Sequence, residues 1–171
     1  DEDWPLAPQS ARGKRRLAAE CLLHDWSGQT GVPVIILRVP GIYGPGRLPV
    51  ERVRQGVPVL IEAEAPWSNR IHADDLAAAC QAAARHGEPG RAYHISDGHP
   101  TTMTDYFWRI ADLYGSPRPP AISMAEARKV LSPAMLSFLE GSKRLDNRRM
   151  REQLGVRLKY PDLASGLPSC R

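Results

Sequence analysis

Apolar residues near the start of the chain recur at intervals of three and four positions, a spacing that predicts a helix over residues 10–26. The recurring residues are Leu17, Ala18, Cys21, Leu22 and Trp26. The next segment, 32–39, is rich in β-branched residues and has no polar alternation before Arg38. That pattern is typical of a strand buried on both faces of a parallel sheet. Together the helix and the strand form half of a β–α–β unit.

The predicted strand ends abruptly in a segment rich in turn-forming residues. Pro40 and Gly41 end it, and Tyr43 and Arg47 stand on either side of a Gly-Pro-Gly sequence. Ligands of open α/β sheets bind outside the carboxyl ends of the strands, so a loop over 40–47 is predicted to reach a ligand site. No glycine-rich nucleotide loop precedes it, and the chain is therefore expected to encode only half of that site.

The rest of the pattern predicts a mixed chain with its strands early and its helices late. Strands are predicted over 57–62, 91–96 and 156–160, and a polar loop over 66–69. Helices are predicted from 74 to 86, from 102 to 115, from 123, from 132 to 141 and from 147 to 154. The predicted helix caps are Asp74 or Asp75, Thr102 with Asp105, and Ser123 with Glu126.

Length and composition favour one globular domain. The chain has 171 residues, of which 42% are hydrophobic and 25% charged, and a formal net charge of +4. The positive excess lies in two clusters, 12–16 and 143–151, which are more often solvated helix faces than phosphate or nucleic-acid sites. No aromatic residues are interleaved with these clusters, so nucleic-acid binding is the weakest of three functional hypotheses, and no nucleic-acid partner is expected.

Cysteine usage indicates a reducing compartment. Cys21, Cys80 and Cys170 are odd in number, far apart and without paired metal spacing, so free thiols and a cytoplasmic location are expected. No apolar run approaches the roughly 18 residues of a membrane helix, and no membrane partner is expected. The acidic start at residues 1–3 is unlike a signal peptide.

The histidines and paired carboxylates have structural interpretations. His72 could exchange a proton near neutral pH, but it lies at a strand-to-helix junction and is expected to be packed and hydrogen-bonded. Asp74 and Asp75 are interpreted as a helix cap rather than as a catalytic pair. His94 and His99 flank a turn, too close in sequence for a metal site, and no metal is expected.

Four stretches, 10–20, 37–47, 70–78 and 93–106, resemble in order the C-terminal half of the extended short-chain dehydrogenase/reductases, the NAD-dependent epimerase/dehydratase superfamily. The most specific read Leu-Arg-Val-Pro-Gly-Ile-Tyr-Gly-Pro-Gly and Ile-His-Ala-Asp-Asp-Leu-Ala. The resemblance implies an α/β fold in one partial domain, 1–171. The last strands of a partial Rossmann-type parallel sheet would occupy about 1–62 and 70–98, and a small, mainly helical substrate-binding region about 99–171. The N-terminal nucleotide-binding half is expected to be absent from this chain.

One departure from the family concerns its catalytic pair. Family members carry a Tyr and a Lys four residues later on one helix, where the ammonium lowers the pKa of the phenol. In this chain the matching positions are Arg12 and Arg16. Arginine stays protonated and cannot act as that acid or base, so the chain resembles atypical members and no catalytic residue is assigned. The two arginines are either a clamp for an anionic group or a solvent-exposed basic turn.

The resemblance also implies binding residues. Val39, Pro40, Gly41 and Ile42 match the stretch that lies beside the nicotinamide ring, and are assigned to cofactor binding. Tyr43 and Arg47 continue that pattern and are assigned to substrate binding. Several relatives place a phosphate-contacting Arg where this chain has Ser68, and Arg70 is assigned as its substitute.

The leading hypothesis is therefore the substrate-side portion of an NAD(P)-dependent epimerase/dehydratase-like oxidoreductase, acting on a small or nucleotide-linked sugar. NAD or NADP is the implied cofactor of the full-length protein, and this chain alone is expected to be inactive. The alternative is a non-catalytic module that binds a dinucleotide or a partner protein, which the arginine replacements favour. A homodimer is implied by resemblance, and a sheet that lacks its first strands is expected to self-associate.

Overall fold

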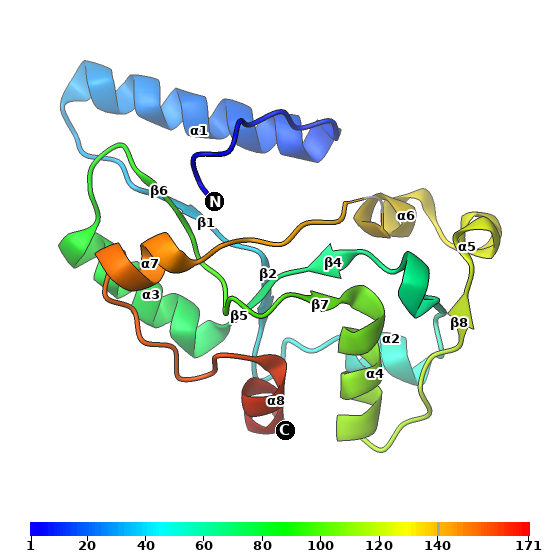
Figure 1. Cartoon of the computed structure of the whole chain (residues 1–171). Helices are drawn as coiled ribbons and strands as arrows, with labels where there is room; N and C mark the ends of the chain where they lie inside the picture. The colour runs from blue at the N-terminus through cyan, green and yellow to red at the C-terminus, as the bar shows by residue number, and fades with distance from the viewer. Residues whose placement is uncertain (140) are drawn as a thin grey trace.

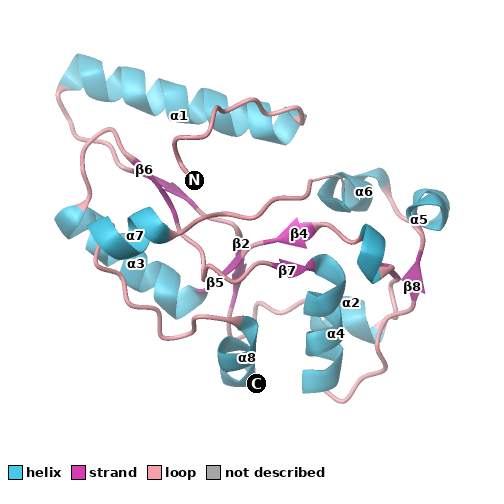
Figure 2. Ribbon diagram, in the orientation of Figure 1, coloured by secondary structure: helices cyan, strands magenta, loops and turns pink. Residues whose placement is uncertain are grey.

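A computed structural model describes residues 1–139 and 141–171, which form an α/β architecture of short strands and helices (Figures 1 and 2). The helices are α1 (Ala11–Thr30), α2 (Val50–Arg54), α3 (Ala73–His86), α4 (Met103–Leu113), α5 (Met124–Val130), α6 (Pro133–Leu139), α7 (Arg148–Gln153) and α8 (Leu163–Gly166), with 3₁₀ turns at Glu62–Glu64 and Leu167–Cys170. The strands are β1 (Ile36–Arg38), β2 (Gly41–Tyr43), β3 (Val59–Leu60), β4 (Trp67–Ser68), β5 (Arg70–His72), β6 (Ala92–His94), β7 (Thr101–Thr102) and β8 (Ala121–Ile122).

The strands associate in pairs, and three of the four pairs are parallel. β1 pairs with β6, β2 with β5 and β3 with β8 in parallel, whereas β4 and β7 are antiparallel. Figure 1 shows α1 on one side of the β1–β6 pair, with α3 and α7 on the other. This arrangement confirms the predicted α/β fold class with short parallel strands.

Helix α1 forms where it was predicted but does not bury its apolar side. Ser10 caps it by accepting the N–H of Gly13, and it continues past the predicted end to Gly31. None of its residues is buried, and Leu22 and Trp26 are 69% and 44% exposed. The three- and four-residue spacing thus predicted the helix correctly, but no described element covers the face it marks.

Strand β1 is shorter than the predicted 32–39, and its loop contains an additional strand. Only residues 36–38 have a parallel partner in β6, and Pro33 has no N–H to donate. The prediction of a continuous loop over 40–47 was wrong for residues 41–43, because β5 supplies a partner in the register Gly41 to Arg70. The turn proper is confined to the Gly-Pro-Gly segment, where Arg47 N–H donates to the Gly44 carbonyl.

Other boundaries differ for similar reasons of pairing. The predicted strand 57–62 is reduced to β3, and the expected loop 66–69 contains β4, because β8 and β7 lie beside them. β8 itself was not predicted. Thr102 and Ser123 cap α4 and α5 as predicted.

The carboxylate of Asp75 explains why no strand forms over 156–160. It is buried at the start of α3 and accepts the backbone N–H groups of Lys159 and Tyr160 at 2.8 and 2.9 Å. His72, and not either aspartate, caps α3, since its Nδ1 accepts the Asp74 N–H. The prediction of an aspartate cap was therefore wrong. Asp75 lies in the first turn of α3 and binds the backbone of residues 159 and 160 instead.

An ion pair covers the open edge of β6. The Arg91 carbonyl and the Ile95 N–H form hydrogen bonds with β1. The backbone N–H and C=O groups of Ala92 and His94 therefore point away from β1. Arg149 donates to the Ala92 carbonyl at 3.1 Å, and the buried Glu2 accepts the His94 N–H at 2.8 Å. Arg149 and Glu2 also approach each other at 3.8 Å.

The interior consists of three apolar clusters that hold the strand pairs to their helices. One joins Ile71, Tyr93 and Ile95 to α3 and α7, and another joins Tyr43 to α2, α4 and the C-terminal segment. The third surrounds Leu60 between β3 and α5. Among the described residues, no helix has both the length and the apolar character to cross a membrane.

We predict that Asp75→Ala destabilises the fold by about 2–4 kcal/mol, because two backbone donors lose a charged acceptor. Urea denaturation followed by circular dichroism measures the change. Asp74→Ala is the matched control, since Asp74 is exposed at the same helix end, and it should cost less than about 1 kcal/mol. Equal effects of the two substitutions would show that Asp75 does not anchor the C-terminal segment.

Candidate functional site

The predicted cofactor-binding segment, residues 39–42, lies between β1 and the end of β2. Val39 and Ile42 are partly buried and pack against the cluster around Ile71. Gly41, between them, is exposed. The segment thus presents a bare stretch of backbone to solvent while its apolar side chains are anchored below.

Arg70 lies on β5 directly beside Gly41 and is almost fully buried, with 8% of its surface exposed. Its guanidinium carbon is 3.4 Å from the centre of the Tyr106 ring. Nη2 donates to Ser68 Oγ at 3.1 Å and to Met103 Sδ at 3.3 Å. Burial lowers the pKa of Arg70, and nearby anionic groups partly offset this effect. The side chain is therefore held rigidly against α4.

The absence of a side chain at Gly41 is what leaves room for this arginine. A Cβ at position 41 would stand 2.8 Å from Arg70 Nη1, closer than real contacts allow. The guanidinium is thus enclosed between Tyr106 and an exposed glycine. Two residues assigned to different roles, cofactor and substrate, meet at this point.

Asp97 is a buried carboxyl group near Arg70 that the site assignment did not include. Its backbone N–H donates to the Arg70 carbonyl at 2.8 Å, and its Oδ1 accepts the N–H of His99. Its Oδ2 is buried without a hydrogen-bond partner among the described residues. Burial raises the pKa of Asp97 to about 6, although the His99 N–H and the Arg70 charge act against it.

Tyr43 and His72 lie on the same face of the β2–β5 pair but inside the core. Tyr43 is fully buried, and its hydroxyl donates to the Asp162 carbonyl at 3.2 Å. Burial raises the pKa of the Tyr43 phenol, so it is poorly suited to replace the missing acid or base. His72 Nε2 lies 3.1 Å from Ser169 Oγ, and its ring packs against Tyr43 and Tyr160. The interpretation of His72 as a packed, hydrogen-bonded residue is confirmed.

The two arginines at the Tyr and Lys positions are exposed on α1, away from this face. The Arg12 guanidinium stacks 4.1 Å above the Phe138 ring and donates to Ser137 Oγ at 3.3 Å, both on α6. Arg12 therefore joins the first helix to the helical region. Arg47 is likewise exposed, at the end of the Gly-Pro-Gly turn.

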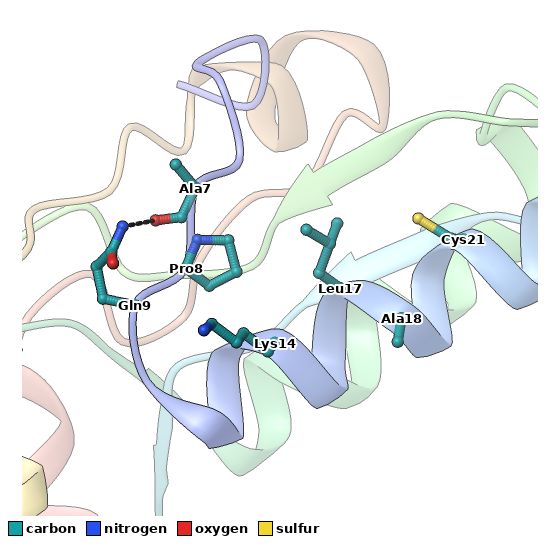
Figure 3. A pocket seen from close by; sticks show the side chains of 7 residues that line it. All are labelled: Ala7, Pro8, Gln9, Lys14, Leu17, Ala18 and Cys21. Carbon is teal, nitrogen blue, oxygen red and sulfur yellow. Dashed lines mark hydrogen bonds between the residues drawn. The ribbon is translucent and has the colours of Figure 1, made fainter.

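A hollow beside α1 is separate from these residues. It measures about 560 Å³ and opens widely to solvent beside the N-terminal half of the helix (Figure 3). Its walls are Ala7, Pro8, Gln9, Lys14, Leu17, Ala18 and Cys21. Among these residues Lys14 is charged and Gln9 is polar, so few polar groups converge in the hollow. Residues 39–42 are not among those that line it.

The sequence analysis missed Tyr106 and Asp97 as partners of Arg70. Asp97 follows a predicted strand directly, and the rule that ligands gather at the carboxyl ends of strands could have identified it. Tyr106 lies on the buried side of α4, and nothing in the sequence marks it as the partner of an arginine 36 positions away. The described residues contain no group of three or more His, Cys, Asp or Glu side chains placed to bind a metal ion.

Comparison with known families adds a match over residues 1–96 to the model of the "NAD dependent epimerase/dehydratase family". A dTDP-L-rhamnose 4-epimerase of Burkholderia thailandensis is 32% identical over 126 residues, which are 66% of this chain and 34% of the epimerase. A 3-diazoavenalumate denitrifying reductase of a Streptomyces species is 28% identical over 98% of this chain and 54% of the reductase. The chain thus spans between about a third and a half of these relatives.

Solved structures are similar over almost the whole chain. A conserved protein of unknown function from Silicibacter pomeroyi superposes with a TM-score of 0.85 at 37% identity, covering 97% of this chain and 56% of that one. The dTDP-glucose 4,6-dehydratase DesIV of Streptomyces venezuelae, solved with NAD and TYD bound, has a TM-score of 0.77 at 22% identity, covering 99% and 52%. The second likeness shows the fold alone.

We predict that Asp97→Asn stabilises the chain at pH 7.5 by about 1–2 kcal/mol. Folding raises the Asp97 pKa from 3.8 to about 6, so the ionised carboxyl destabilises the native state above pH 6, and this cost disappears as pH falls to about 4. The melting temperatures of the variant and the wild type should therefore converge near pH 4. Asp25→Asn, on the exposed face of α1, is the control and should leave the pH profile unchanged. A constant difference at every pH would contradict the assignment.

Proposed function

This chain belongs to the NAD dependent epimerase/dehydratase family, and we propose that it is the substrate-side portion of an NAD(P)-dependent oxidoreductase acting on a nucleotide-linked sugar. The observation that carries the proposal is the β2–β5 pairing, which brings the exposed Gly41 beside the buried Arg70. Gly41 follows the carboxyl end of β1 by three residues and Arg70 lies beside it, and ligands of α/β sheets bind near the carboxyl ends of strands. The dTDP-sugar enzymes among its relatives support this substrate class.

In this proposal residues 39–42 lie beside the nicotinamide ring of NAD or NADP. The bare backbone at Gly41 fits a flat ring, because no side chain stands above it and its apolar neighbours hold it in place. When bound, the nicotinamide would supply hydride-transfer chemistry. The contribution of this chain is to orient the ring and to exclude water from one side of it.

Three residues are proposed to bind the substrate or to support the segment that binds it. Arg47 is exposed and free to contact the phosphates of a sugar nucleotide. Tyr43 supports the loop from within through its buried ring, and Arg70 reaches the ligand from beneath Gly41.

We further propose that residues 1–62 and 70–98 form the sheet-bearing part and 99–171 the substrate-side part of a single partial domain. The two parts are joined by a strand pair, since β3 pairs with β8. Substrate contacts from the second part would thus be coupled to the first.

A non-catalytic binding module is the second candidate function. The observation that favours it is that Arg12, at the Tyr position of the family, contacts Phe138 and Ser137 on α6. An arginine held in this way cannot exchange protons. Quenching of NADH fluorescence without turnover of any sugar nucleotide would favour this module over the enzyme.

We predict that Arg47→Gln lowers the affinity of the chain for dTDP-glucose about tenfold, because one charged contact to phosphate is lost. Isothermal titration calorimetry at low ionic strength measures it. Arg85→Gln, exposed at the far end of α3, is the matched control and should bind as the wild type does. Absence of dTDP-glucose binding by the wild-type chain would overturn the proposed function.

We also predict self-association through α1, because Leu22, Leu23 and Trp26 leave an apolar surface exposed on it. The double substitution Leu22→Glu and Trp26→Glu should shift the chain toward the monomer in light scattering coupled to size-exclusion chromatography. The control is Val130→Glu on α5, which removes an equally exposed apolar residue elsewhere. A wild-type chain that remains monomeric at a concentration of about 100 μM would contradict the predicted self-association.

A further inference from the structure

The guanidinium of Arg70 has donor groups that the protein does not use. Its Nε is buried and has no hydrogen-bond partner among the described residues. Both hydrogen bonds seen for the side chain come from Nη2, and no described residue accepts from Nη1. Unpaired donors on a buried charged group are costly. The arrangement therefore resembles a polar site that a ligand completes.

Gly41 provides the access to this site. Nη1 lies where a Cβ at position 41 would be crowded, and Gly41 itself is exposed. One face of the guanidinium is covered by the Tyr106 ring. The exposed glycine therefore gives a ligand atom a route to Nη1.

The charges around Arg70 indicate what kind of atom is accepted. The carboxylates of Asp97 and Asp105 both act on the Arg70 guanidinium, and that of Asp97 is buried. The positive charge is thus partly offset from within the protein. A phosphate would meet these carboxylates as well as the arginine, whereas a hydroxyl group brings no charge of its own.

We propose that Arg70 donates a hydrogen bond from Nη1, over Gly41, to an oxygen of an uncharged hydroxylated ring such as a hexose, and that it is not a phosphate site. The inference rests on the proposed function, because it subdivides the same substrate site. Arg47, which is exposed, is left to contact the phosphates. Arg70 then selects the sugar and not the nucleotide.

The test follows the side-chain NMR resonances of Arg70 in the 171-residue chain labelled with ¹⁵N-arginine. One titration uses methyl α-D-glucopyranoside and the other inorganic pyrophosphate. The glucoside should shift the Arg70 resonance saturably, and pyrophosphate should leave it in place. Gly41→Ala should weaken the glucoside response at least about fivefold, because the new methyl group covers Nη1. Gly28→Ala, in open space on α1, is the matched control and should respond as the wild type does.

Three outcomes would overturn the inference. They are a stronger Arg70 response to pyrophosphate than to the glucoside, no response to either, and a glucoside response that Gly41→Ala leaves intact. Adding dTDP-glucose separates this failure from that of the proposed function. Binding of dTDP-glucose that leaves the Arg70 resonance unmoved would overturn the inference and keep the function, whereas a glucoside response without dTDP-glucose binding would do the reverse.

Discussion

The parallel pairing of β2 with β5 is the constraint on which the site depends. Its register fixes three neighbours at once, with Gly41 beside Arg70, Ile42 beside Ile71 and Tyr43 beside His72. The middle pair is apolar and packs into the cluster with α3 and α7, and the outer pairs face the opposite side, where Tyr43 joins the cluster with α2 and α4. A shift of the register by one residue would move the side chains of β2 to the opposite faces. A residue with a side chain would then be buried beside Arg70 in place of Gly41. The pairing thus determines both the fold and the opening over the arginine.

Burial divides the polar residues of this region into those that hold it and those that remain free to act. His72 uses both ring nitrogens, one on the α3 cap and one toward Ser169, and Asp75 uses both oxygens. Arg70 and Asp97, by contrast, keep unpaired atoms among the described residues. Groups whose hydrogen bonds are complete stabilise the scaffold, and incomplete ones are the natural candidates for ligand contacts.

Local patterns in the sequence predicted the longer helices well, missed the short α2 and α8, and predicted the strands less well. Ser10, Thr102 and Ser123 cap their helices because capping depends on residues three positions apart. Strands β2, β4 and β8 exist because partners distant in sequence lie beside them, which no local pattern records. The same limit applies to the site, where Gly41 was identified from its motif. Its contact with Arg70 and the stacking on Tyr106 depend on the register and on α4, and could not be read from the chain.

The ion pair of Glu2 and Arg149 affects how β6 meets other molecules. Because Arg149 covers the Ala92 carbonyl and Glu2 covers the His94 N–H, two side chains take the positions that a further strand would occupy. A foreign segment seeking to join by β-augmentation would have to displace a carboxylate and a guanidinium that are already matched to the backbone. This border of the sheet is therefore protected against domain swapping and fibril-like growth by charged side chains from the N-terminal segment and from α7.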